Sequence, residues 1–155
     1  MITMSEESKK LFETTVGMSF IATRMVQNSI QNKISKLRDD VNFEQMLVLM
    51  ELDYEDGLRP SVIAERLHRS KGTMTSLIRH AEKNELIASA KDPSHKNAKR
   101  LFLTLKGKKV HDQLAQMIRD EMSFATQDLN DEERKHVFSA MEKVILRYKP
   151  DFYEV

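Results

Sequence analysis

Apolar residues recur at helical spacing over most of this 155-residue chain. Intervals of three and four residues predict helices over six segments: 8–37, 43–54, 61–67, 70–81, 104–125 and 130–148. Only residues 86–90 and 100–103 depart from this spacing, and they read as two short strands joined by a long polar loop. The sequence therefore predicts a mainly α fold with one small β-hairpin.

Residues that stabilise helix starts stand at the head of most of these segments. A side-chain oxygen at this position accepts a hydrogen bond from a free backbone N–H of the first turn. We expect this role for Asn42, Ser61, Ser70 and Thr104, and we expect the last helix to begin near Asn130. Within the first helix Gly17 is a weak point, because glycine lowers helix stability.

The charge is distributed unevenly along the chain. The segment from Arg59 to Val110 holds thirteen Lys and Arg against four Asp and Glu, about +9. The remaining residues hold 12 basic and 20 acidic side chains, about −8, so the near-zero net charge hides two regions of opposite sign. A basic patch on an acidic body is typical of nucleic-acid-binding proteins, although a solvated charged face without a partner produces the same count.

The basic segment also contains a recognisable order of elements. Two of the predicted helices, 61–67 and 70–81, are joined by a short turn at residues 68–70, which is typical of a helix-turn-helix. The following hairpin, with its long basic loop, then forms a wing. We predict a winged helix-turn-helix, and thus a DNA-binding region, over about residues 41–104.

The helices at the two chain ends carry apolar stripes that a small DNA-binding core does not need. We therefore predict dimerisation helices over about residues 5–37 and 105–148. The alternative, in which these helices fold back on one monomer, stays open. At this length we expect the chain, 1–155, to form a single domain.

Several other classes of protein are disfavoured by the sequence. No cysteine is present, and no apolar run approaches the length of a membrane span. The N-terminus lacks the pattern of a secretory signal, so we expect a cytoplasmic protein. We find no glycine-rich phosphate loop and no local catalytic arrangement, so we expect neither an enzyme nor a cofactor. His111 and Asp112, with distant His80 and His136, give no compact ligand spacing, so we predict no metal site.

Four segments together resemble the MarR-type winged helix-turn-helix transcriptional regulators. Phe43–Leu49 is similar to the helix that precedes the DNA-reading module of that family. Ser61–Leu67 resembles the first helix of its helix-turn-helix, with Ala64 as the small residue at the helix contact. Ser70–Ile78 resembles the recognition helix, and Leu103–Gly107 resembles the exit from the wing. The resemblance covers most of the chain by element order, and its residue-level signal lies between Phe43 and Val110.

The resemblance implies a homodimer that binds double-stranded DNA at a palindromic operator and acts as a regulator, for example a repressor. The recognition helix would then lie in the major groove. We expect phosphate contacts from its N-terminal end and base contacts from Thr75, Ser76 and Arg79. The complete set of expected DNA-binding residues is Ser70, Lys71, Thr73, Thr75, Ser76, Arg79, Lys91, Lys96, Lys99 and Arg100. The alternative is a winged-helix protein for architectural DNA binding or protein contacts, without operator specificity.

The chain departs from the family pattern at several positions. His68 stands where glycine is usual between the two helices, and Arg69 replaces a small apolar residue. Glu85 replaces a glycine after the recognition helix, so we expect Asn84 to be the left-handed C-cap. At the wing tip the family usually has Asp and, two residues later, Arg. Here these places hold His95 and Asn97, so the expected minor-groove arginine is absent.

Family membership also implies a small-molecule effector, bound between the dimerisation helices and the winged region. The flexible apolar side chains that are candidates for such a pocket are Met18, Phe20, Ile21, Met25, Met46 and Met50. Methionine at helical spacing is also ordinary core, and that alternative stays open.

Overall fold

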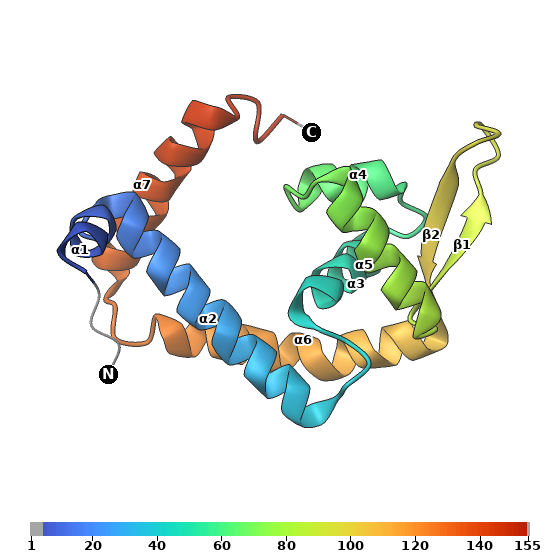
Figure 1. The fold of residues 1–155 in the computed structure, drawn as a ribbon, viewed down its shortest axis with the longest axis horizontal. Coiled ribbons are helices and arrows are strands. Elements are labelled where there is room, and N and C mark those ends of the chain that lie inside the picture. The colour runs from blue at the N-terminus through green and yellow to red at the C-terminus, as the bar shows by residue number, and fades with distance from the viewer. Residues whose placement is uncertain (1–4, 155) are drawn as a thin grey trace. The chain divides into compact units, whose positions relative to one another are not determined.

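The computed structural model describes residues 5–154, with the side chain of Leu11 excepted. Its residues form two compact units, Met1–Glu121 and Met122–Val155. The helices are α1 (Glu6–Phe12), α2 (Thr15–Leu37), α3 (Phe43–Tyr54), α4 (Pro60–Arg66), α5 (Lys71–Lys83), α6 (Leu105–Ala125) and α7 (Asp131–Tyr148), and the strands are β1 (Ile87–Lys91) and β2 (Lys99–Leu103) (Figure 1). The predicted mainly α fold with one hairpin is confirmed.

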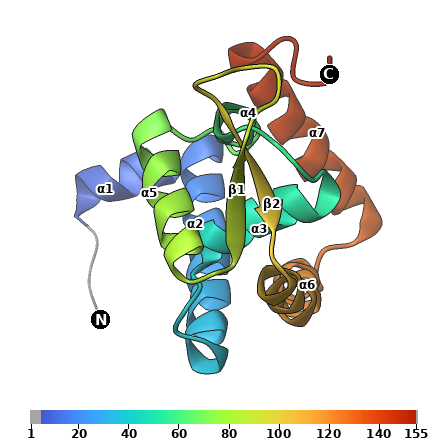
Figure 2. The same ribbon diagram turned by 90° about the vertical axis from the view of Figure 1, so that its right-hand side faces the viewer.

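The order α3–α4–α5–β1–β2–α6 in the first unit is that of a winged helix-turn-helix. The two strands pair antiparallel with Ile87 opposite Leu103 and Lys91 opposite Lys99. The hairpin rises from the start of α6, and its tip points away from that helix (Figures 1 and 2). An isolated bridge from Leu58 to Leu101 joins the segment before α4 to β2, so the wing is tied to the helix-turn-helix by backbone hydrogen bonds.

One apolar core holds the first unit together. It takes Ile30 and Ile34 from α2 and continues through α3, α4 and α5 to Ile118 of α6. The largest side chains with almost no exposed surface are Ile30, Ile34, Met46, Leu49, Leu52, Ile63, Met74, Leu86, Leu101, Leu114, Ile118 and Val48. Fully burying each such side chain stabilises the fold by about 1.5–3 kcal/mol, and this fixes the inner faces of the helices that carry the basic residues.

Most of the predicted helix caps are present. Asn42 forms a capping box with Gln45, and the Ser70 hydroxyl accepts the N–H of Thr73 at 3.2 Å. Asn130, near which the last helix was expected to begin, also forms a capping box, with Glu133. Thr104 Oγ1 accepts the N–H of Gly107 at 2.9 Å. The prediction for Ser61 is wrong. α4 begins one residue earlier, with Arg59 as the N-cap and Pro60 as the first helical residue, because the fixed φ of proline suits that position.

The predicted first helix, 8–37, is two helices in the structure. The break falls at residues 13 and 14, where Thr14 is extended and its hydroxyl accepts the N–H of Gly17 at 3.0 Å. Threonine competes well for such a capping role, so the chain restarts there as α2. Gly17 then lies in the first turn of α2 and does not interrupt it.

Two non-glycine residues take the left-handed backbone. His68 has φ 51°, so it adopts a backbone conformation that glycine takes more readily than other residues. The other is Glu85 with φ 58°, and the prediction of Asn84 as the left-handed residue is wrong, since its φ is −86°. The Leu86 N–H donates to the Ala81 oxygen at 2.9 Å, a six-to-one closure that requires the left-handed residue at position 85.

The second unit contains α7 and the segment after it. The Tyr153 hydroxyl donates to the Glu142 carboxylate at 2.7 Å, and this bond raises the pKa of Tyr153. α7 leaves several large apolar side chains exposed, among them Val137, Phe138 and Tyr148. Over the described residues, the helices are all too short or too polar to cross a membrane.

Gly107 marks the closest approach between the first turn of α6 and the wing. An ideal Cβ at this residue would lie 1.9 Å from the carbonyl oxygen of Leu86, and the neighbouring Thr104 hydroxyl also bonds the Glu85 and Leu86 oxygens, at 2.6 and 3.1 Å. No side chain can occupy that space without moving the backbone that links α5 to β1.

Gly107→Ala should therefore lower the free energy of unfolding, by about 1–3 kcal/mol or more, as an overpacked core site does. The measurement is urea denaturation followed by circular dichroism. Gly72→Ala is the matched control, because a Cβ at Gly72 would meet no atom within 4 Å. Equal stability of the Gly107→Ala variant and the wild type would contradict the close contact.

Candidate nucleic-acid interface

α5 has one face in the core and one face in solvent. Met74, Ile78 and Ala81 are buried, and the opposite face is exposed. Thr75, Ser76 and Arg79, the predicted base-reading residues, all lie on the exposed face. Arg79 has no hydrogen bond or ion pair among the described residues, so its guanidinium is available to a ligand.

The N-terminal end of α5 presents polar groups to solvent. Ser70 Oγ lies 2.9 Å from Thr73 Oγ1, and the Thr75 hydroxyl donates to the Lys71 oxygen at 2.9 Å. Lys71 is exposed and has no ion pair among the residues that the structure describes. A helix N-terminus with a neighbouring lysine attracts an anion, because its free N–H groups and the helix dipole favour negative charge.

The C-terminal end of α5 is fastened to the loop before α3. Asn84 Nδ2 donates to the Asp40 oxygen at 2.6 Å, and Lys106 Nζ donates to the Asn84 oxygen at 2.8 Å. The Asp40 carboxylate is paired with Arg38 and Lys106, and the hydrogen bond from Arg38, above all, lowers its pKa to about 2. These contacts fix the C-terminal end of α5 against the loop before α3 and the start of α6.

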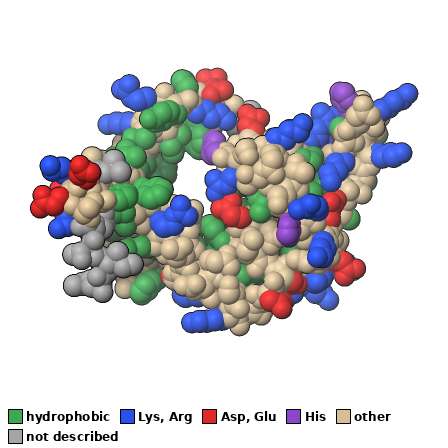
Figure 3. All heavy atoms as spheres, viewed as in Figure 1, with side chains coloured by type: hydrophobic (Ala, Val, Ile, Leu, Met, Phe, Trp, Pro, Cys, Tyr) green, Lys and Arg blue, Asp and Glu red, His purple; other side chains and the backbone are tan. Residues whose placement is uncertain are grey.

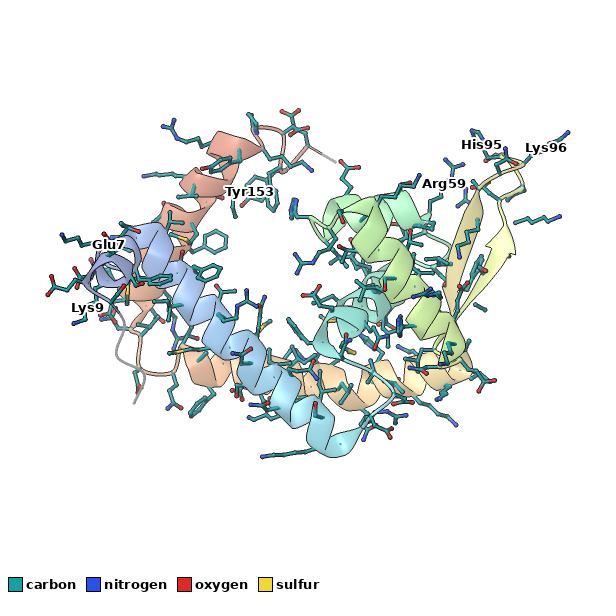
Figure 4. The ribbon with its side chains drawn as sticks, viewed as in Figure 1. Glu7, Lys9, Arg59, His95, Lys96 and Tyr153 are labelled. Atoms are coloured by element: carbon teal, nitrogen blue, oxygen red, sulfur yellow. The ribbon has the colours of Figure 1, made fainter. Side chains whose placement is uncertain are left out.

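A buried carboxylate organises the start of the wing loop, directly after β1. The Asp92 side chain has no exposed surface, and Arg59 Nε donates to it at 2.6 Å. Ser94 contributes its backbone N–H at 2.9 Å and its hydroxyl at 2.7 Å, and Arg100 Nε lies 3.2 Å away. Figure 4 shows Arg59 between the helix-turn-helix and the hairpin. Because Arg59 is the N-cap of α4, this contact links the wing loop directly to the helix-turn-helix.

These donors hold Asp92 in its charged form. The hydrogen bond from Arg59, followed by those from Ser94, places the pKa of Asp92 well below its usual range. A carboxylate without exposed surface is costly unless it is paired and hydrogen-bonded, and here both conditions are met. The loop geometry therefore depends on the ionised state of Asp92.

The predicted wing residues divide into two kinds. Lys99 pairs with Glu82 at 3.3 Å, and Arg100 donates to the Gly57 oxygen at 3.1 Å besides facing Asp92, so both have partners within the protein. Lys91 and Lys96 are exposed and have no ion pair among the described residues. His95 and Lys96 lie at the wing tip, where Lys and Arg side chains gather (Figures 3 and 4).

A groove separates the wing from the helix-turn-helix. Its cavity volume is about 550 Å³, and it is lined by residues of α4, of the first turns of α5 and of the wing. Four of its lining residues are basic: Arg59, Arg69, Lys71 and Lys99. Arg69 forms a two-bond ion pair with Glu44, at 2.8 and 2.7 Å, which gives a structural role to a residue that departs from the family pattern.

The six residues predicted for an effector pocket are spread over two environments. Met18, Phe20 and Met25 of α2 are more than half exposed, whereas Met46 of α3 is fully buried in the core. Ile21 is partly exposed, and Met50 packs against the core. None of the six lines the groove beside the wing. The effector pocket stays a prediction.

The packing of α3 on α6 forms a cluster that sequence spacing does not reveal. Asp53 of α3 joins His111 and Asp112 of α6, and one ligand atom from each lies within 4.8 Å of the others. Lys108 Nζ is 2.5 Å from Asp53 Oδ1 and 3.0 Å from Asp112 Oδ1. The ammonium of Lys108 pairs with both carboxylates, and the His111 ring also contacts each of them, at 3.6 and 3.0 Å, so the cluster forms an ion-pair and hydrogen-bond network within the protein.

Sequence reasoning counted Arg59 as part of the basic segment and gave it no role. The signal that points to it is Asp92, since no other acidic residue stands between Glu85 and Asp112. A lone carboxylate among basic side chains is a natural partner for one of them. Which arginine it takes depends on how the wing folds against α4.

Comparison with known proteins supports the fold. Residues 41–97 match the profile of the MarR family. The transcriptional regulator SlyA has a TM-score of 0.78 at 20% identity, over 89% of this chain and 96% of that chain. The Staphylococcus aureus MepR–DNA complex has 0.78 at 22% identity, over 94% and 100%. A mutant MarR from Escherichia coli complexed with operator DNA has 0.75 at 18% identity, over 82% and 90%. No curated protein matches the chain.

Asp92→Asn should lower the free energy of unfolding at neutral pH, by about 1–2 kcal/mol, because it removes the charge that the two arginines face. A carboxyl group with a lowered pKa contributes stability above its unfolded pKa and loses it as the pH falls through the folded value. The difference between variant and wild type should therefore shrink below about pH 4.

Urea denaturation at pH 7 and pH 3 measures this difference. Asp56→Asn is the control, because Asp56 is exposed and has no partner among the described residues. A difference that is the same at both pH values would show that the charge of Asp92 does not stabilise the wing.

Proposed function

Because residues 41–97 of this chain match the model of the MarR family, we propose that the protein is a transcriptional regulator that binds double-stranded DNA in a sequence-specific way. One observation carries the proposal. Thr75, Ser76 and Arg79 form an exposed row on a helix whose opposite face is fixed in the core. Such a helix enters the major groove with its side chains toward the base edges. The solved relatives complexed with DNA support the same use of the fold.

The residues around this row fit the negatively charged DNA backbone. Ser70, Thr73 and Lys71 would bind phosphate at the start of α5, and Lys91 and Lys96 would bind phosphate from the wing. Lys99 and Arg100 would contribute less, because each already faces a carboxylate of the protein, Glu82 and Asp92 respectively. Arg79 is the residue able to bind a guanine through two hydrogen bonds, worth about 1–3 kcal/mol against a wrong base.

We also propose that the protein acts as a homodimer on a palindromic operator. Large apolar side chains are exposed on the helices at both chain ends, including Phe20 and Met25 in the first unit and Phe138 and Tyr148 in the second. Apolar patches of this kind mark protein interfaces, and two-fold dimers are the commonest assembly. We further propose that a small-molecule effector controls DNA binding, because the resemblance to the MarR family implies one.

The alternative is architectural DNA binding without operator specificity. Selection of binding sites from random double-stranded DNA separates the two functions. Recovery of one palindromic motif supports a regulator, whereas equal recovery of all sequences, with affinity that depends only on salt, supports architectural binding.

Arg79→Ala should weaken binding to the selected operator and should relax the preference at one base position, because the side chain that distinguishes that base is lost. Competition with operators altered one base at a time measures this effect. Lys91→Ala is the control. It should weaken binding to all sequences alike and lower the slope of log K against log salt by about 1. An Arg79→Ala variant that behaves like the control would show that Arg79 binds phosphate.

A dimer that reads DNA with two copies of α5 should require two half-sites about one helical turn apart, roughly 34–36 Å. Footprinting on operators with altered half-site spacing measures this requirement. Insertion of five base pairs should abolish tight binding, because it places the half-sites on opposite faces of the duplex. A footprint on one asymmetric half-site would contradict the dimer.

A further inference from the structure

We propose that Gly72 is a specificity-determining residue that lets the first turn of α5 approach DNA closely. The inference rests on the proposed function and adds a residue to the predicted contacts. Gly72 has no side chain that could donate or accept a hydrogen bond, so sequence reasoning about such groups does not identify it. The position of Gly72 in the structure identifies it.

Gly72 has no structural requirement within the free protein. It is the second residue of α5, it is exposed, and its backbone is helical. A Cβ added there would meet no atom within 4 Å. Most residues stabilise a helix better than glycine, so the fold alone would favour alanine at this position.

The two other glycines whose surroundings are described differ in this respect. Gly57 has φ +72°, a conformation that side chains disfavour. Gly107 lies so close to the Leu86 carbonyl that no Cβ fits. Each of these has a reason within the fold, whereas the space beside Gly72 is empty and open to an external partner.

The position of Gly72 on α5 indicates what that partner is. Residues at i, i+3, i+4 and i+7 share one face of a helix. Counted from Gly72, these positions hold Thr75, Ser76 and Arg79, which are the exposed residues proposed to read bases. Gly72 therefore lies on the reading face, at its N-terminal end, where a recognition helix contacts the edges of bases.

The backbone of Gly72 also has a free donor. The N–H of Thr73 bonds Ser70 Oγ at 3.2 Å, and the N–H of Met74 bonds the Ser70 oxygen at 3.0 Å. The N–H of Gly72 has no partner among the described residues. Without a side chain beside it, this N–H is open to a phosphate or base oxygen, as expected at a helix N-terminus.

The consequence is that stability and DNA binding respond to Gly72 in opposite directions. Gly72→Ala should leave the melting temperature unchanged or raise it, because alanine favours the helix and meets no neighbour. The same variant should bind the selected operator roughly tenfold more weakly, the size of one lost base contact. Gly72→Leu should bind more weakly still, because its larger side chain holds the helix farther from the groove.

The experiment measures thermal unfolding and operator affinity of the full chain for the wild type and both variants. Binding to DNA without the operator, at the same salt concentration, is the control and should change less than operator binding. Weaker operator binding by a variant that is as stable as the wild type supports the proposal. Operator affinity within about twofold of the wild type for both variants, or a loss that accompanies a lower melting temperature, overturns it. Failure of the wild type to select any operator would instead contradict the proposed function.

Discussion

The winged region depends on the close contact between Gly107 and the Leu86 carbonyl, which joins α6 to the backbone between α5 and β1. Leu86 follows α5 and precedes β1, and Gly107 stands in the first turn of α6 after β2. Thr104 bonds the same carbonyl and caps α6 at Gly107. One short stretch of backbone thus fixes α5, the hairpin and α6 against one another. Because the packing leaves no room for a Cβ, the angle between these elements has little freedom.

The wing is fixed a second time where its loop begins, by charge. Asp92 lies without exposed surface between Arg59, Arg100 and Ser94, so its carboxylate connects the loop to the start of α4 and to β2. This arrangement pairs Arg59 and Arg100 with one shared carboxylate within the protein. Among the described residues, the exposed side chains of Lys71, Arg79, Lys91 and Lys96 have no ion pair. The count of basic residues therefore overstates the charge that this region offers to an anionic partner.

Residue-level comparison shows where sequence reasoning succeeded and where it failed. Asn42, Ser70 and Thr104 were predicted as caps, and each accepts the N–H of the residue three positions later. The two strands were predicted within one residue of their observed bounds. The left-handed residue after α5 was assigned to Asn84 from propensity, but the six-to-one closure at Leu86 requires it at Glu85. Local preference gave way there to the hydrogen-bond pattern of the helix end.

The sequence by itself determined the helices, the hairpin, the exposed row Thr75–Ser76–Arg79 and the resemblance to a DNA-binding family. These depend on spacings of two to four residues, which a linear pattern contains. Only the tertiary structure decided that Asp92 binds Arg59, that Asp53 meets His111, and that the space beside Gly72 is open. The first two are contacts between residues 33 and 58 positions apart in the sequence. The open space beside Gly72 depends on where all the other segments pack. Such relations arise from packing, so the order of residues alone does not contain them.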